Sequence, residues 1–343
     1  MKDFKSNKGL NVNKQNKLNT RKSRARGLGF KFQLIAPILG LTLFLSACSK
    51  LGLEESKAGE GKEVGEQITI NHELGEAKVA TNPERIVVFD YSLLDILDYL
   101  EVSVVGLPKS SLPSFLSKYQ DESYGDVGTL KEPDFEKVFE LKPDLILISS
   151  RTQGAYEELN KIAPTVYLAV DNSDYMKSVR ENVSTLTKLV GKVDSGESEL
   201  KKLEDQALNI QAKAEAKGEN ALILLANDGS LSVYGKDSRF GLIHHALGFA
   251  QADTGIEEST HGQNVTYEYI LEKDPDHLFV IDRNQVVGGE VDASSVMNNE
   301  ILSGIKATIN NTVHYLDAEV WYITSGGLIG TGKMLDEIEK VLK

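Results

Sequence analysis

The chain has 343 residues, 41% of them hydrophobic and 26% charged, which is enough for two domains that each bury a hydrophobic core. Its charge is divided unevenly: ten Lys and Arg oppose one acidic residue before residue 48, whereas 28 Lys and Arg oppose 50 Asp and Glu from residue 48 onward. The resulting net charge of −22 after residue 48 argues against nucleic acid as a partner.

The first 47 residues have the pattern of an export signal, so they are left out of the predicted fold. A basic leader precedes an apolar stretch at 34–45, which is shorter than the roughly 20 residues that a membrane-spanning helix needs. The sequence Leu-Ser-Ala-Cys that ends at Cys48 is typical of a bacterial lipobox, whose cysteine becomes the lipidated first residue of the exported protein. We therefore predict a lipoprotein signal peptide at 1–47 and lipidation of Cys48; a lone buried thiol is the alternative. Cys48 is the only cysteine, so the sequence predicts no internal disulfide.

Residues 48–66 are polar, glycine-rich and poor in apolar side chains, so they are predicted to form a flexible tether. Beyond them, short apolar runs typical of buried strands alternate with helical patterns in two halves of the chain. The runs are 85–90, 144–149 and 165–170 in the first half and 220–228, 276–282 and 314–317 in the second. This alternation predicts two α/β lobes with largely parallel sheets, at 67–172 and 218–343.

The segment 173–217 between the two lobes carries two successive apolar stripes at helical spacing. An interruption at 194–196 allows either two helices or one kinked helix. A long helical connector is stiff, so we expect the lobes to tilt by small angles around a ligand cleft that lies between them.

A segment of the first lobe recurs in the second lobe after 132 residues: 135–151 matches 267–283. The coinciding pairs are Glu136/Glu268, Glu140/Glu272, Pro143/Pro275, Asp144/Asp276 and Arg151/Arg283. Each repeated arginine follows a predicted strand, where α/β folds place their ligands. A single arginine would be expected to pair with a nearby carboxylate, but the recurrence of Arg151 and Arg283 favours a shared cleft for an anion. Arg239, in a Gly-flanked loop that runs into a predicted helix, is a third candidate. Three guanidinium groups that converge on one pocket would repel one another unless an anion neutralised them.

His261 and Tyr322 are candidate metal ligands in the same region. His261 lies in a polar loop before the second repeat, where the 132-residue offset matches it to Thr129, and Tyr322 follows the last predicted strand. Imidazole and phenolate both bind iron, and phenolate suits Fe(III). A loop hydrogen bond for His261 and a partly buried ring for Tyr322 are the ordinary alternatives. The sequence carries no hydrolase, zinc-protease or phosphate-loop motif and no catalytic cysteine, so we expect no enzymatic activity.

From about residue 67 onward the chain resembles the siderophore-binding lipoproteins of bacterial ABC importers, most of all their catecholate branch, which includes petrobactin-binding proteins. The stretches that carry the resemblance are PERIVVFDYSLLDIL (83–97), GLPKSSLPSFLSKY (106–119), DVGTLKEPDFEKV (126–138), GKDSRFGLIH (235–244), STHGQ (259–263) and LFVIDRN (278–284). The resemblance implies a class III-type binding protein, with two α/β lobes bridged by a helix. It also implies a monomer without a resident cofactor that is anchored through Cys48 on the extracellular face of a Gram-positive cell membrane.

The resemblance further implies a role for each candidate residue. The ligand would be a ferric siderophore bound by Arg151, Arg239 and Arg283. His261 and Tyr322 would contact iron where the siderophore leaves coordination positions open. Glu136 and Glu268 would dock onto arginines of the ABC permease; a solvated helix face is the alternative for these two. Two other classes remain open on sequence alone: a haem- or metal-ion-binding (Zn or Mn) importer component, and a cell-surface enzyme or adhesin.

Overall fold

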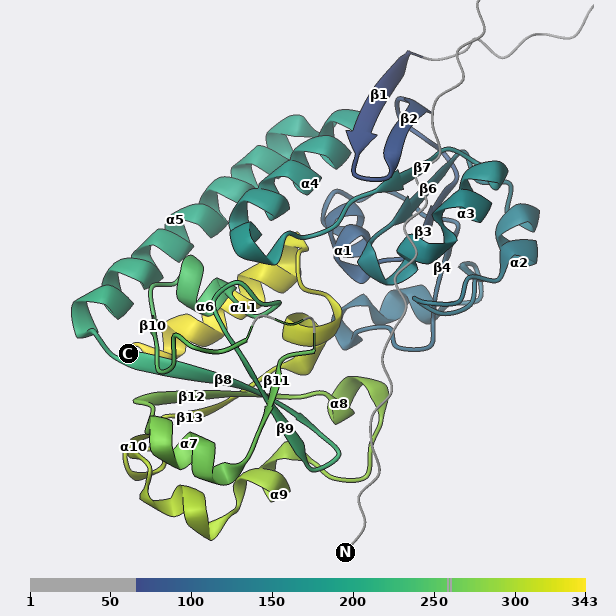
Figure 1. The fold of residues 1–343 in the computed structure, drawn as a ribbon. Helices are drawn as coiled ribbons and strands as arrows, with labels where there is room; N and C mark the ends of the chain where they lie inside the picture. The colour runs from purple at the N-terminus through teal and green to yellow at the C-terminus, as the bar shows by residue number, and fades with distance from the viewer. Residues whose placement is uncertain (1–65, 258, 260) are drawn as a thin grey trace, which may run out of the picture. The chain divides into compact units, whose positions relative to one another are not determined.

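The computed structural model describes residues 66–257, 259 and 261–343, which belong to one compact unit, Gly61–Lys343 (Figure 1). The predicted signal peptide 1–47, the lipidation site Cys48 and the predicted tether, apart from Glu66, lie outside the described residues. Within the described ranges, no helix combines the length and the apolar composition that crossing a bilayer requires.

The N-terminal lobe contains a five-stranded sheet in the order β5-β4-β3-β6-β7, and every pair in it is parallel. The strands are β3 (Ile86–Val88), β4 (Gly106–Leu107), β5 (Gly125–Asp126), β6 (Leu145–Ile148) and β7 (Thr165–Tyr167). The helices are α1 (Tyr91–Tyr99), α2 (Phe135–Glu140) and α3 (Tyr156–Ile162). An antiparallel hairpin, β1 (Gln67–His72) and β2 (Gly75–Ala80), precedes this sheet and was not predicted from the sequence.

The C-terminal lobe contains a six-stranded sheet in the order β11-β9-β8-β12-β13, with β10 paired to β8. The strands are β8 (Asn220–Asn227), β9 (Ser230–Tyr234), β10 (Ala250–Gln251), β11 (Gln263–Val265), β12 (His277–Asp282) and β13 (Val313–Leu316). The helices are α6 (Leu242–His245), α7 (Tyr267–Lys273), α8 (Asn284–Val287), α9 (Ala293–Met297), α10 (Lys306–Ile309) and α11 (Leu328–Val341). The three predicted strands β8, β12 and β13 are parallel, whereas β9 and β11 run antiparallel to their neighbours. The two predicted α/β lobes are therefore present.

The connector consists of two helices, α4 (Tyr175–Leu189) and α5 (Val193–Lys217), so the two-helix alternative holds. The break lies at 190–192, where Gly191 has a φ of +67°, and not at 194–196 as the sequence suggested. Gly196 lies inside α5 for a different reason. A Cβ there would meet the side chain of Thr187 at 2.3 Å, so glycine permits α4 and α5 to pack closely.

Helix α11 joins the two lobes to the connector, since it packs against both α5 and α1 (Figure 1). A single cluster of buried apolar side chains includes Leu97 of α1, Leu203 of α5, Leu335 of α11 and Ile223 of β8. The same cluster includes Trp321 and Ile323 of the segment Glu319–Ile323, which precedes α11. The core of both lobes therefore holds this segment in place.

The repeat of 132 residues has a structural explanation in both lobes. Lys142 and Asp274 adopt positive φ values of 48° and 39° directly before the repeated prolines, and so end α2 and α7. The aspartate after each proline then binds the start of the neighbouring strand. Asp144 accepts hydrogen bonds from the backbone N–H of Arg85 at 2.9 Å, and Asp276 accepts one from Asn220 at 3.0 Å. Each copy thus sets the register of a central strand, β6 or β12.

Candidate ligand-binding cleft

The three predicted arginines converge on the ring of Tyr322 from both lobes. Arg151 lies in the 3-10 turn Ser150–Ala155 after β6, Arg239 in the loop between β9 and α6, and Arg283 directly after β12. The guanidinium carbon lies 4.2 Å from the Tyr322 ring centroid for Arg239, 5.8 Å for Arg283 and 6.0 Å for Arg151. One aromatic ring is therefore the common neighbour of all three cations.

Polar atoms of the short π-helix Glu319–Ile323 hold these side chains in place. Arg151 donates to the Tyr322 carbonyl at 2.7 Å, and Arg239 donates to the same oxygen at 2.8 Å. Arg283 donates through Nε to the Tyr322 hydroxyl at 3.0 Å and through Nη1 to Asn227 at 2.7 Å. In the part of the chain that the structure describes, none of the three forms an ion pair with a carboxylate within 4.0 Å. Their positive charges are thus left without a protein counterion there.

The proximity of the three arginines to Tyr322 changes the pKa values of Arg239 and Tyr322. Burial lowers the pKa of Arg239, and the nearby charge of Arg151 lowers it further. Burial by itself raises the pKa of Tyr322, but the hydrogen bond from Arg283 and the charges of Arg239 and Arg283 outweigh it, so the net pKa is lowered. The site consequently favours negative charge at the Tyr322 oxygen and at any group that enters beside the arginines.

A cavity of about 320 Å³ opens beside these side chains, a size within the usual range for ligand sites. Its lining comes from both lobes: Asp90, Lys131, Ser149, Ser150, Arg151, Val170, Asn172, Arg239, His261, Tyr322, Ile323 and Ser325. Four of the five predicted site residues are among them. The fifth, Arg283, is not part of the lining; it lies behind Tyr322 and binds its hydroxyl.

Two charged residues of this lining were not singled out from the sequence. The repeat offset placed the loop around Thr129 at the cleft, and Lys131 of this loop does line the cavity. Thr129 itself does not; its hydroxyl accepts hydrogen bonds from the backbone N–H groups of Lys131 and Glu132. Asp90 follows β3 as Arg151 follows β6, so the rule that selected strand-end arginines would also have found this carboxylate.

Glu136 and Glu268 occupy equivalent places in the two lobes. Each lies exposed in the first turn of its helix, α2 or α7. Glu140 and Glu272 on the same helices are exposed as well, so exposure does not distinguish between the two pairs.

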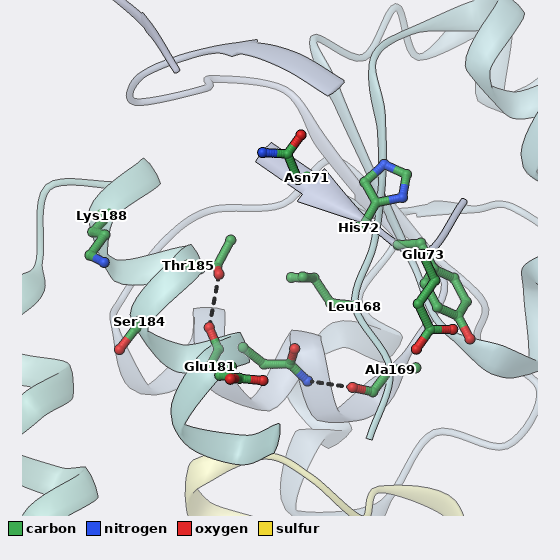
Figure 2. A pocket seen from close by; sticks show the side chains of 11 residues that line it. Asn71, His72, Glu73, Leu168, Ala169, Glu181, Ser184, Thr185 and Lys188 are labelled. Carbon is green, nitrogen blue, oxygen red and sulfur yellow. Dashed lines mark hydrogen bonds between the residues drawn. The ribbon is translucent and has the colours of Figure 1, made fainter. Parts of the chain in front are cut away.

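A larger groove of about 420 Å³ lies away from these residues, between the β1–β2 hairpin and α4 (Figure 2). Its charged side chains include Glu73, Glu181 and Lys188, so acidic and basic groups are mixed. Figure 2 also shows that Thr185 is bonded to the Glu181 carbonyl of its own helix. We regard the smaller cavity as the candidate site, because cations from both lobes meet there without a carboxylate partner among the described residues.

Two α/β lobes that are bridged by helices and supply side chains to one cavity define the class of bilobal ligand-binding proteins. A model of the periplasmic binding protein family matches residues 86–320, and the chain belongs to this family, whose members bind ligands and are not enzymes. Over 317 residues the chain is 43% identical to the petrobactin-binding protein YclQ of Bacillus subtilis, covering 91% of this chain and 99% of that protein. It is 34% identical to the ferric-anguibactin-binding protein FatB of Vibrio anguillarum, over 80% of this chain and 87% of that protein.

Solved structures agree with these sequence matches. The crystal structure of YclQ aligns with a TM-score of 0.79 at 45% identity, covering 81% of this chain and 99% of that one. The catecholate-siderophore-binding protein VctP of Vibrio cholerae aligns with a TM-score of 0.77 at 32% identity, covering 80% and 100%. The predicted class III-type fold and the predicted resemblance to siderophore-binding proteins are thereby confirmed.

Proposed function

We propose that this protein is the substrate-binding component of an iron-siderophore ABC importer, and that it captures a ferric catecholate-type siderophore and delivers it to the permease. The observation that carries the proposal is the meeting of Arg151, Arg239 and Arg283 at Tyr322, with no carboxylate partner in the described part of the chain. An anionic guest would neutralise this group. The similarity to petrobactin- and catecholate-siderophore-binding proteins supports the catecholate class.

The charge of such a guest matches the site. A tris-catecholate complex of Fe(III) carries three negative charges, and guanidinium groups offer planar, paired donors to catecholate oxygens. The net charge of −22 after residue 48 repels anions at long range. Because charges farther than about 8 Å are screened at physiological salt, the arginines at the cavity dominate once the guest arrives. Affinity should therefore survive moderate salt.

The arginines divide into two roles under this proposal. Arg151 and Arg239 line the cavity and would exchange their bonds to the Tyr322 carbonyl for bonds to the guest. Arg283 would act through the Tyr322 hydroxyl, which it holds and whose pKa it helps to lower. His261 and Tyr322 would bind iron directly when a tetradentate siderophore leaves two positions open. The iron is cargo in this scheme.

The remaining parts of the proposal concern delivery. Glu136 and Glu268 are exposed at equivalent places in the two lobes, which suits a permease that contacts both lobes at once. A lipid on Cys48 would hold the protein at the extracellular face of the cell membrane, with the tether giving it reach.

The test is a titration that follows the fluorescence of Trp321, the only tryptophan in the chain. Trp321 is fully buried beside Tyr322 and donates to Glu337 at 2.7 Å, so it should report quenching by a coloured iron complex in the cavity. The panel holds ferric catecholate, mixed citrate-catecholate and hydroxamate siderophores, with haem and Zn²⁺ as separate ligands. We expect tight quenching by the catecholate-containing complexes. Binding of haem or Zn²⁺ alone would contradict the proposal.

A further inference from the structure

Among the residues that the structure describes, the cavity lining includes one carboxylate, Asp90, and one of its two oxygens has no partner there. Asp90 is 6% exposed and caps α1 through Oδ1, which accepts from the backbone N–H of Ser92 at 2.9 Å and of Leu93 at 3.3 Å, and from the Ser92 hydroxyl. Oδ2 takes no hydrogen bond and no ion pair in the described ranges of the chain.

Oδ2 also remains accessible. In the described ranges, three side-chain polar atoms are fully covered and also lack a partner: His72 Nε2, Asn284 Oδ1 and Thr324 Oγ1. Asp90 Oδ2 lacks a partner as well but is not among these three, so it is not fully covered. Since Asp90 lines the arginine cavity, this uncovered oxygen is the one of its two that is free to bind a guest.

An open carboxylate is unexpected in a cavity that suits a triple anion. Left unneutralised, it would repel the catecholate oxygens and weaken binding, and burial increases the cost of an unpaired charge. The cations of the same cavity do not pair with it within 4.0 Å in the described part of the chain. A guest that brings its own cation to Asp90 turns this repulsion into a charge-assisted hydrogen bond.

We propose that Asp90 binds a protonated amine in the backbone of the siderophore, so that the preferred guest combines an anionic ferric catecholate centre with an ammonium group. This inference rests on the proposed function and specifies the substrate class of the same site. Arg151 and Arg239 bind the iron-bearing part of the guest, and Asp90 selects its organic backbone. A neutral amide donor in place of the amine is an outcome that the test distinguishes.

The test uses three synthetic ferric siderophores with the same catechol groups and the same backbone length. One carries a secondary amine in its backbone, one a methylene and one an amide at the same position. We expect the wild-type protein to bind the amine compound about tenfold or more tightly than the methylene compound, the size typical of a hydrogen bond to a charged group. The amide compound should resemble the methylene compound.

The informative variant is Asp90→Asn, because asparagine caps a helix as well as aspartate does but carries no charge. This variant should bind the amine and methylene compounds within about twofold of each other. Asp134→Asn is the matched control: Asp134 caps α2 by accepting from Lys137 at 3.1 Å but does not line the cavity, so its preference should equal that of the wild type. Thermal unfolding checks each variant, and Asp90→Ser replaces Asp90→Asn if the latter does not fold.

The outcomes separate the two proposals. If the wild type binds none of the three compounds, the proposed function itself fails. If it binds all three equally, or if Asp90→Asn keeps the amine preference, the role of Asp90 is wrong while the proposed function stands. An amide compound that binds as tightly as the amine compound would also overturn the assignment of a cation to this position.

Discussion

Replacing Arg239 by Gln should weaken the binding of a ferric catecholate strongly while leaving the stability of the empty protein almost unchanged. Arg239 lies closer to the Tyr322 ring than Arg151 or Arg283 does, and burial lowers its pKa. A cation without a carboxylate partner among the described residues stabilises a bound anion more than it stabilises the empty fold. Removing it should therefore change the Kd for the ligand much more than the free energy of unfolding.

The magnitudes can be worked out from the geometry around Tyr322. Arg239 and Arg151 lie no farther apart than the sum of 4.2 Å and 6.0 Å, their distances from the ring centroid. At this upper limit of roughly 10 Å and an effective dielectric constant of about 20, two positive charges repel by about 1.7 kcal/mol, which is a minimum, and Arg283 adds a similar amount. Against this repulsion stand the hydrogen bond to the Tyr322 carbonyl, about 1 kcal/mol, and the cation–π contacts with Tyr322 and Phe240, about 0.5–2 kcal/mol. The opposing contributions nearly cancel, so the Tm should change by less than about 3 °C.

The ligand, in contrast, loses at least one charge-assisted hydrogen bond, which corresponds to roughly a 10- to 150-fold weaker Kd. Arg180→Gln is the matched control, since Arg180 pairs with Glu204 at 2.6 Å and Glu197 at 3.0 Å on the connector. Its loss should lower the Tm by about 2–4 °C and leave the Kd unchanged. Fluorescence titration and thermal unfolding of both variants give the comparison. An unchanged Kd for Arg239→Gln, with a Tm loss as large as that of Arg180→Gln, would refute the reasoning.

Three further predictions concern iron contact, delivery and pH. His261→Ala and Tyr322→Phe should each weaken a tetradentate bis-catecholate complex by about tenfold or more and spare a hexadentate one, whose iron is already saturated; equal losses for both ligands would argue against iron contact. Glu136→Ala combined with Glu268→Ala should reduce iron uptake by cells while the Kd of the purified protein stays the same. Asp95 is fully buried, and burial raises its pKa to about 7, so the folded state holds a proton that the unfolded state releases near pH 4. Its contribution to stability is therefore complete below about pH 4 and is lost as the pH rises through 7, and Asp95→Asn should remove this loss in thermal unfolding between pH 4 and 8.

The central strands of both lobes could be predicted because buried parallel strands are continuous apolar runs. All six predicted runs became strands, among them β3, β6, β8 and β12. Several of the missed strands have weaker signals. β4 and β5 have two residues each, and β1 carries polar residues at most of its positions. The break in the connector was misplaced because a glycine that ends a helix and one that permits close packing look alike in a sequence.

The candidate site was accessible to sequence analysis only through rules about local structure. The position after a strand pointed to Arg151 and Arg283, and the repeat between the lobes separated them from ordinary surface arginines. The rule could not reveal that Arg283 lies behind Tyr322 and not in the cavity lining, because this depends on how the π-helix Glu319–Ile323 packs between the lobes. Lys131 lines the cavity because the turn at Thr129 directs the chain there. The 132-residue offset aligns positions along the sequence and carries no information about the conformation of this turn.

A crystal structure with a bound ferric catecholate, in which anomalous scattering locates the iron, tests the role of the cavity most directly. We predict an iron peak in the cavity lined by Arg151, Arg239 and Tyr322, with both guanidinium groups bonded to catecholate oxygens. An iron peak in the groove between the β1–β2 hairpin and α4, or arginines that keep all their bonds to the Tyr322 and Ile323 carbonyls, would contradict the proposed site.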